Sequence, residues 1–176
     1  MIRGVFSGCF GFLLLFFSTS NTWSSDFDIG VMEFHRGNYA IALREWKALA
    51  SVGHMEAQYN LAWMYSNGKG VEQDYETAVK WYALAAEQGL AVAQYNLALK
   101  YDSGIGVPQN YKAAIKWYTL AAEQGHVDAQ FNLGQFYDTG EGGEHDYETA
   151  LKWYTLAAEQ SDPDAQYFFC LLYTSD

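Results

Sequence analysis

Basic residues, cysteine and proline are all scarce in this 176-residue chain. It holds 10 lysines and arginines against 21 aspartates and glutamates, which gives a formal net charge of −11. Nucleic acids and anionic membranes are bound through clustered basic side chains, so we expect neither as a partner. The only cysteines are Cys9 and Cys170, which excludes a disulfide framework. The fold must therefore be held together by packing.

Long apolar runs are also missing, except for one near the start. Residues 11–17 read GFLLLFF, with Arg3 before them and small residues after them. This order is typical of a secretory signal peptide, and the run is shorter than the ~20 residues that span a bilayer. We expect residues 1–24 to be a signal peptide, cleaved after Ser20 or Ser24, and the mature chain to lie in the periplasm or extracellular space without a membrane span. The alternatives are an uncleaved anchor and a misassigned start codon.

Most of the chain consists of internal repeats. Shifted by 36 residues it aligns with itself without a gap from Asn38 to Gln166, and the stretch KWYTLAAEQ occurs twice. The columns shared by the copies are, in the first unit, Ala57, Gln58, Leu61, Tyr65, Gly68, Gly70, Asp74, Trp81 and Ala85–Ala86. A period of this length indicates supersecondary units that bury their apolar faces by stacking on one another.

Each unit is predicted to contain two helices. In the first unit, apolar residues at helical spacing indicate one helix over about Glu56–Tyr65 and another over about Tyr75–Gln88. Glycines end the first helix, and Asp74 caps the second. Complete units are expected at residues 54–89, 90–125 and 126–161. The predicted fold is all-α, an α/α solenoid of stacked antiparallel helix pairs.

The two ends depart from this unit. Residues 25–53 match only the second-helix columns, with Trp46 one position later than the other tryptophans. We expect an N-terminal capping half-repeat there. Residues 162–176 start a fourth unit and stop inside its first helix, so we expect that unit to be truncated. Cys170–Asp176 also resemble a translated library adapter, which would make them foreign; the alternative is a genuine short C-terminal cap.

Over about Tyr39–Gln166 the chain resembles the Sel-one-like repeat family, a branch of the tetratricopeptide-like α-solenoids. The resemblance is carried by AQYNLAWMYSNGKGVEQDYETAVKWYALAAEQG and the two copies that follow it. Departures such as Ala62 and Ala98, where the family has glycine, affect packing only. The resemblance implies an adaptor that binds protein partners on its concave face and has no catalytic activity. A cysteine-rich branch linked to β-lactam-like molecules has a disulfide in each repeat, which this chain lacks, so that activity is not carried over.

Asparagine recurs once in each unit, at Asn60, Asn96 and Asn132, away from the main apolar stripe of the first helix. The resemblance implies that this helix lines the concave groove. There an asparagine amide can pair with both the N–H and the C=O of an extended peptide. The neighbouring residues predicted to contact the same partner are Tyr59, Trp63, Tyr95 and Phe131. The alternative is that the asparagines cap or bridge helices inside the stack.

No pattern in the sequence indicates catalytic residues, a cofactor or a metal site. His54 and His126 share a column two units apart, roughly 20 Å or more, which is too far for one metal ion. His145 lies in the acidic loop GEGGEHD, whose spacing differs from calcium loops, so we interpret it as a solvated loop. The predicted function is a non-catalytic scaffold or adaptor of the bacterial envelope that binds a protein or peptide. The alternatives are a secreted enzyme or small-molecule binder acting on cell-wall material, and a fragment of a larger repeat protein.

Overall fold

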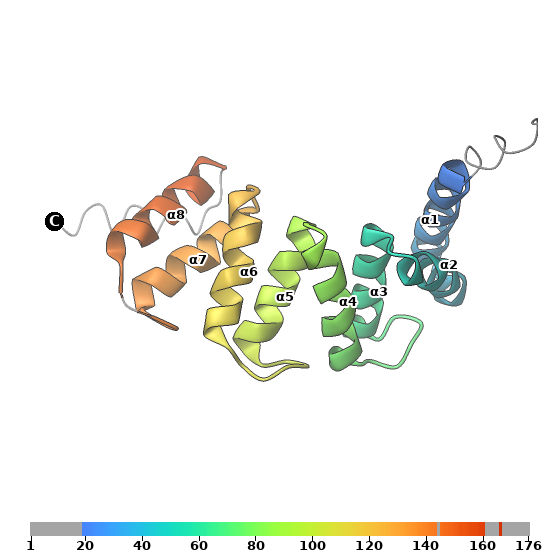
Figure 1. Ribbon diagram of the computed structural model, residues 1–176, viewed down its shortest axis with the longest axis horizontal. Coiled ribbons are helices and arrows are strands. Elements are labelled where there is room, and N and C mark those ends of the chain that lie inside the picture. The colour runs from blue at the N-terminus through green and yellow to red at the C-terminus, as the bar shows by residue number, and fades with distance from the viewer. Residues whose placement is uncertain (1–18, 144, 161–165, 167–176) are drawn as a thin grey trace, which may run out of the picture.

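The computed structural model describes residues 19–143, 145–160 and Gln166, and within them the chain forms a row of eight helices without strands (Figure 1). The helices are α1 (Thr19–His35), α2 (Tyr39–Ser51), α3 (Met55–Asn67), α4 (Tyr75–Glu87), α5 (Ala91–Ser103), α6 (Tyr111–Glu123), α7 (Val127–Thr139) and α8 (Tyr147–Glu159). Each helix packs on the next one along the chain. The predicted all-α solenoid is confirmed.

The predictions for the two ends of the chain are only partly covered by these residues. Positions 1–18 of the predicted signal peptide lie outside the described residues, and α1 begins at Thr19, ahead of both proposed cleavage positions. Both cysteines and the predicted fourth unit, apart from Gln166, also lie outside. None of the described helices is both long enough and apolar enough to cross a membrane.

The helix ends follow from short polar side chains and glycines. Asp74, Asn110 and Asp146 each accept a hydrogen bond from a backbone N–H in the first turn of α4, α6 and α8, at 3.0–3.1 Å. The first helix of each unit ends on a glycine in the left-handed conformation, for example Gly68 with φ of 64°. These caps satisfy N–H and C=O groups that the helix itself leaves free. The predicted caps are confirmed, and α3 runs two residues past Tyr65.

The second glycine of each inter-helix loop touches the preceding unit. Gly106 has φ of 78°, and a Cβ added to it would lie 2.5 Å from the carbonyl oxygen of Tyr75, at the start of α4. Gly70 and Gly142 face Tyr39 and Tyr111 in the same way. The loop therefore needs glycine both for its backbone angle and for close approach. This explains the glycine column as a structural feature.

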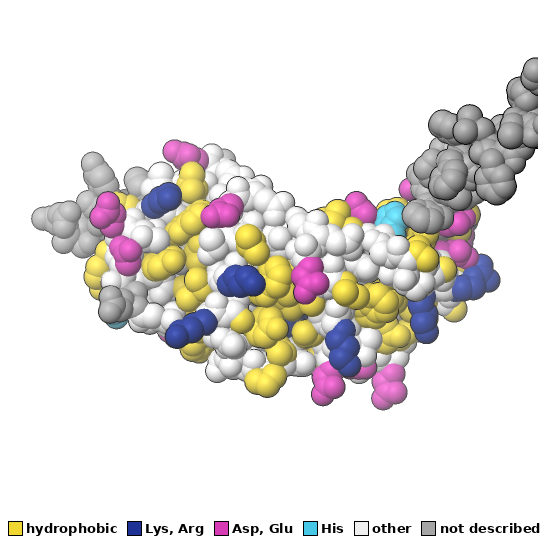
Figure 2. All heavy atoms as spheres, viewed as in Figure 1, with side chains coloured by type: hydrophobic (Ala, Val, Ile, Leu, Met, Phe, Trp, Pro, Cys, Tyr) yellow, Lys and Arg dark blue, Asp and Glu magenta, His cyan; other side chains and the backbone are white. Residues whose placement is uncertain are grey.

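The core is built from alanines and from the aromatic residue in the middle of each second helix. Tyr82, Tyr118 and Tyr154 are at most 1% exposed, and an aromatic ring of the first helix in the same unit packs on each of them. The neighbouring tryptophans are only half-buried: Trp81 packs against the buried residues of two successive units, and Trp117 does the same one unit later. The stack therefore places tyrosine inside each unit and tryptophan between units. Figure 2 shows the resulting bent outline, hollowed along one edge.

A buried glutamine links three helices at each junction. Gln94 on α5 is 4% exposed; its Nε2 donates to the carbonyl oxygen of Ala86 on α4 at 3.1 Å. Its Oε1 accepts from Nε2 of Gln124, the residue directly after α6, at 2.7 Å. Gln58 and Gln130 make the same pairs of bonds in their own units. We call this arrangement the glutamine link. The sequence shows the column, but the role of the side chain appears only in three dimensions.

The helices α1 and α2 form a full pair where the sequence predicts a capping half-repeat. Phe27 packs on Trp46 with ring centroids 6.4 Å apart, as Tyr59 packs on Tyr82 at 5.8 Å in the next unit. Gly30 lies directly against Trp46. Trp46 therefore occupies the place of the buried tyrosine, which explains its one-residue offset. The 36-residue alignment does not show α1, because the turn after this helix is four residues shorter than the later inter-helix loops.

The glutamine link makes a testable prediction about stability. We expect Gln94→Leu to lower the free energy of unfolding by about 1–3 kcal/mol, because it removes two buried hydrogen bonds, one to the Ala86 carbonyl and one from the Gln124 amide. Gln135→Leu, the same change at an exposed position of α7, should cost less than about 0.5 kcal/mol. Urea denaturation of both variants measures the difference. Equal effects of the two substitutions would contradict the assigned role.

The helix caps make a second prediction, about pH. The Thr77 hydroxyl and its backbone N–H hold the pKa of Asp74 below its ordinary value, and Thr149 does the same for Asp146. A carboxylate with a lowered folded-state pKa stabilises the fold above its unfolded pKa, and this contribution is lost as pH falls through the folded value. Stability should therefore drop below about pH 4.

The matched variant is Asp74→Asn with Asp146→Asn, which copies the natural cap Asn110. Because an amide caps at every pH, the double variant should lose less stability than the wild type on acidification. Urea denaturation between about pH 7 and pH 3 measures both slopes. Identical slopes would show that these caps do not contribute to acid sensitivity.

Candidate partner-binding site

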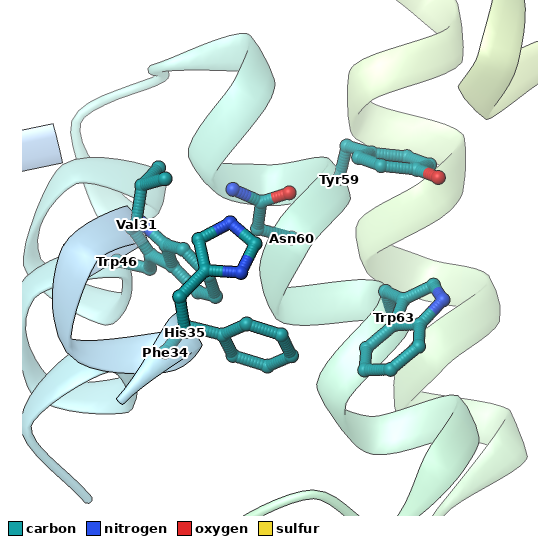
Figure 3. Close-up of a pocket in the computed structure, with 7 residues that line it drawn as sticks. All are labelled: Val31, Phe34, His35, Trp46, Tyr59, Asn60 and Trp63. Carbon is teal, nitrogen blue, oxygen red and sulfur yellow. The ribbon is translucent and has the colours of Figure 1, made fainter. Parts of the chain in front are cut away.

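A pocket of about 270 Å³ opens between the first two units (Figure 3). Its lining residues are Val31, Phe34 and His35 from α1, Trp46 from α2, and Tyr59, Asn60 and Trp63 from α3. We call it the α1–α3 pocket. Three of the residues predicted from the sequence, Tyr59, Asn60 and Trp63, come together here. The α1 residues were missed because the shorter turn after α1 shifts this helix out of the 36-residue alignment.

The walls of the α1–α3 pocket are aromatic rings that hold one another in place. Phe34 meets Trp63 edge to face with centroids 5.5 Å apart, and its centroid is 5.4 Å from that of Trp46. Tyr59 rests on the buried Tyr82 at 5.8 Å. Edge-to-face and tilted pairs at these separations are favourable. The pocket wall is therefore formed before any partner arrives.

Asn60 offers free hydrogen-bonding capacity at this pocket, as does the buried Nε1 of Trp46. The Asn60 side chain is half-buried, and none of the described residues forms a hydrogen bond with its amide. Figure 3 shows the Asn60 amide directed toward the side chains of α1, while the Tyr59 and Trp63 side chains point away from this amide. An asparagine amide carries two donors and an acceptor. Asn60 can therefore bind both an N–H and a C=O group of a bound molecule.

The other two asparagines of the column behave differently. Asn96 donates from Nδ2 to the carbonyl oxygen of Val92, one turn back in its own helix, at 2.7 Å. Asn132 donates from Nδ2 to the Tyr118 hydroxyl at 3.2 Å, which bridges α7 to α6. The alternative reading, in which asparagines are used within the stack, thus describes Asn96 and Asn132. The three side chains do not form one uniform row of free amides.

Two further aromatic residues were predicted to contact the partner, and both are packed outside the α1–α3 pocket. Tyr95 stacks on His126 with centroids 4.5 Å apart, and burial raises the pKa of its hydroxyl. Phe131 lies against Tyr154 at 5.7 Å. The structure places them in the same column as Tyr59, one and two units further along. It does not bring them into one pocket with Asn60.

A second pocket of about 200 Å³ lies between α5 and α7, and we call it the α5–α7 pocket. Its lining residues are Asp102, Asn132, Gln135, Phe136, Thr139 and Glu141. The Tyr118 hydroxyl is 3.4 Å from Oδ2 of Asp102, to which it donates. Burial raises the pKa of Asp102, and the nearby Glu141 carboxylate raises it further. Neither carboxylate has a lysine or arginine within 4.0 Å in the part of the chain that the structure describes.

The histidines serve local structure where the structure describes them. His54 sits at the start of α3, where its Nδ1 accepts from the Ala57 N–H at 3.3 Å. His126 holds the same position before α7, and burial lowers its pKa. His145 lies 2.9 Å from the Asp138 carbonyl oxygen through Nδ1 and stacks on Tyr147. Among the described residues no three histidine, cysteine or acidic side chains are grouped to hold a metal ion.

Comparisons with known proteins agree with this architecture. A family model of the Sel1 repeat matches residues 56–90, 91–126 and 127–162. A Sel1 repeat protein from Oxalobacter formigenes is 36% identical with a TM-score of 0.81, and the match covers 85% of this chain and 61% of that one. No curated protein matches the sequence.

Two further solved structures are similar. The protective antigen c5321 of uropathogenic Escherichia coli, described as displaying an SLR fold, is 37% identical with a TM-score of 0.78; the match covers 83% of this chain and 32% of that one. Cysteine-rich protein B of Helicobacter pylori, at 18% identity and a TM-score of 0.57 over 72% of this chain and 91% of that one, shares the fold. The chain thus spans less than two thirds of the first two proteins.

Proposed function

The chain belongs to the Sel1-repeat family, and on that premise we propose that it is a scaffold that binds an extended segment of a partner protein in the α1–α3 pocket. Sel1-repeat proteins are commonly scaffolds for protein interactions and are typically not catalytic. The observation that carries the proposal is the free amide of Asn60 beside preformed aromatic walls. We propose that this partner is a protein or peptide of the bacterial envelope.

The aromatic lining of the α1–α3 pocket suits a single apolar side chain of a peptide. Burying one large apolar side chain contributes roughly 1.5–3 kcal/mol. The Asn60 amide matches the adjacent peptide group, as in other modes of extended-peptide recognition. The titratable residues of the lining are His35 and Tyr59, which do not form an acid–base pair.

A peptide selection with site variants tests this proposal. We expect the full chain to enrich peptides with a bulky apolar residue from a random displayed library. Asn60→Ala should weaken binding of a selected peptide about tenfold, which corresponds to about 1.4 kcal/mol, and Trp63→Ala should weaken it at least as much. Fluorescence anisotropy with the labelled peptide gives the dissociation constants.

The matched control is Asn96→Ala, which removes the same amide one unit along, where it is already bonded to its own helix. It should leave the dissociation constant unchanged. Thermal unfolding of all three variants shows whether any loss comes from the fold. Equal losses for Asn60→Ala and Asn96→Ala, or losses that follow the melting temperature, would contradict the site.

We also propose that the chain is exported, which rests on the sequence of residues 1–24 alone. A positive residue, a short apolar run and small residues are the features that direct secretion. Fusing residues 1–24 to an alkaline phosphatase that is active only outside the cytoplasm should give an active reporter in bacteria. Arg3→Glu with charged residues in the run GFLLLFF should abolish the activity. An inactive wild-type fusion retained in the cytoplasm would overturn export.

A further inference from the structure

The α5–α7 pocket repeats the α1–α3 pocket with a different chemistry, and we infer that it binds a lysine or arginine side chain of the same extended segment. The inference rests on the proposed function, because it assigns the second contact of that partner. The basis is the position of the two pockets in the repeat, the acceptor groups of the second pocket, and its missing counter-ion.

The two pockets share three equivalent positions of the repeat. Phe34 lies four residues after Gly30, and Asp102 lies four residues after Ala98; Gly30 and Ala98 both face the buried aromatic residue of their own unit. The positions that match across the two pockets, two units apart, are Asn60 and Asn132, Trp63 and Gln135, and Phe34 and Asp102. The pockets therefore open on the same face of the solenoid. A segment that follows this face meets both of them.

Substitution at these positions changes the pocket from apolar to acidic. The phenylalanine and tryptophan of the first pocket become an aspartate and a glutamine in the second, and Glu141 is added from the following loop. Nδ2 of Asn132 is already bonded to the Tyr118 hydroxyl, so the free capacity of its amide is mainly that of an acceptor. Lysine and arginine carry only donors and therefore complement such a lining.

The charge of the α5–α7 pocket is not balanced within the described chain. The half-buried Asp102 and the exposed Glu141 both lack an ion pair there, although like charges placed near each other repel. Lys112 lines an adjacent pocket with Glu141 but does not come within 4.0 Å of its carboxylate. A cationic side chain of a partner would supply the missing charge. The net charge of −11 for the whole chain also favours a basic partner by long-range attraction.

The spacing of the pockets sets the spacing of the two side chains in the partner. Packed helices lie about 8–10 Å apart, so two units along the row of first helices correspond to about 20 Å. An extended chain advances about 3.3 Å per residue. The partner segment should thus carry its bulky apolar residue and its basic residue about six positions apart.

Synthetic peptides with one tryptophan and one lysine, separated by three to nine glycine and serine positions, test the inference. With the full wild-type chain, binding in fluorescence anisotropy should be tightest at a separation of about six. Replacing the lysine by glutamine should weaken that peptide about tenfold, and the difference should shrink as salt is raised. For the double variant Asp102→Asn with Glu141→Gln, the lysine and glutamine peptides should bind equally.

The matched control is Asp138→Asn, which changes the aspartate of the same column one unit later, outside the lining of the α5–α7 pocket. It should keep the full preference for lysine. If the wild type binds both peptides equally, or the control loses the preference as the double variant does, the second contact is overturned while apolar binding through Trp63 still supports the proposed function. If no peptide of the series binds, the proposed function fails and this inference fails with it.

Discussion

The glutamine link is the interaction on which the regularity of this solenoid depends. A buried amide such as that of Gln94 is bonded to a helix of the previous unit and to a helix of its own unit, so it sets the rotation and height of each pair relative to the last. The tyrosine and alanine columns fill the space around it but are non-directional. Buried hydrogen bonds are directional and costly to leave unmade, which makes them suited to fixing a register.

A fixed register has a functional consequence. Because each unit is placed in the same way, a given column always faces the same direction, and the chemistry of a pocket depends only on which residues occupy a few columns. The near-identical stretch KWYTLAAEQ supplies packing rings and the spacer alanines. The first helices carry the variation, with Trp63 at the α1–α3 pocket and Gln135 at the α5–α7 pocket. In the proposed function, recognition thus depends on the exposed columns of the first helices.

Much of the fold was predictable from sequence because its causes are local. Asp74 and Gly68 act within one turn, and helical spacing is visible in any single unit. The candidate site was harder to predict from the sequence. Asn60, Asn96 and Asn132 are identical in sequence, yet only the structure shows one free amide, one bonded within its helix and one bridging to Tyr118. The role of Phe34 could not be predicted because a shorter turn conceals α1. The role of Asp102 could not be predicted because its pocket lies between α5 and α7, which are 36 residues apart in the sequence.

The central claim is that one face of the first helices holds an extended partner while the second helices hold the stack. Hydrogen exchange measured by mass spectrometry, with and without a library-selected peptide, tests it directly. We expect slower exchange on binding in α1, α3, α5 and α7, around residues 31–35, 59–63 and 132–139. Exchange in the second helices, α4, α6 and α8, should change little. Protection confined to the second helices, or spread evenly over both, would contradict the account.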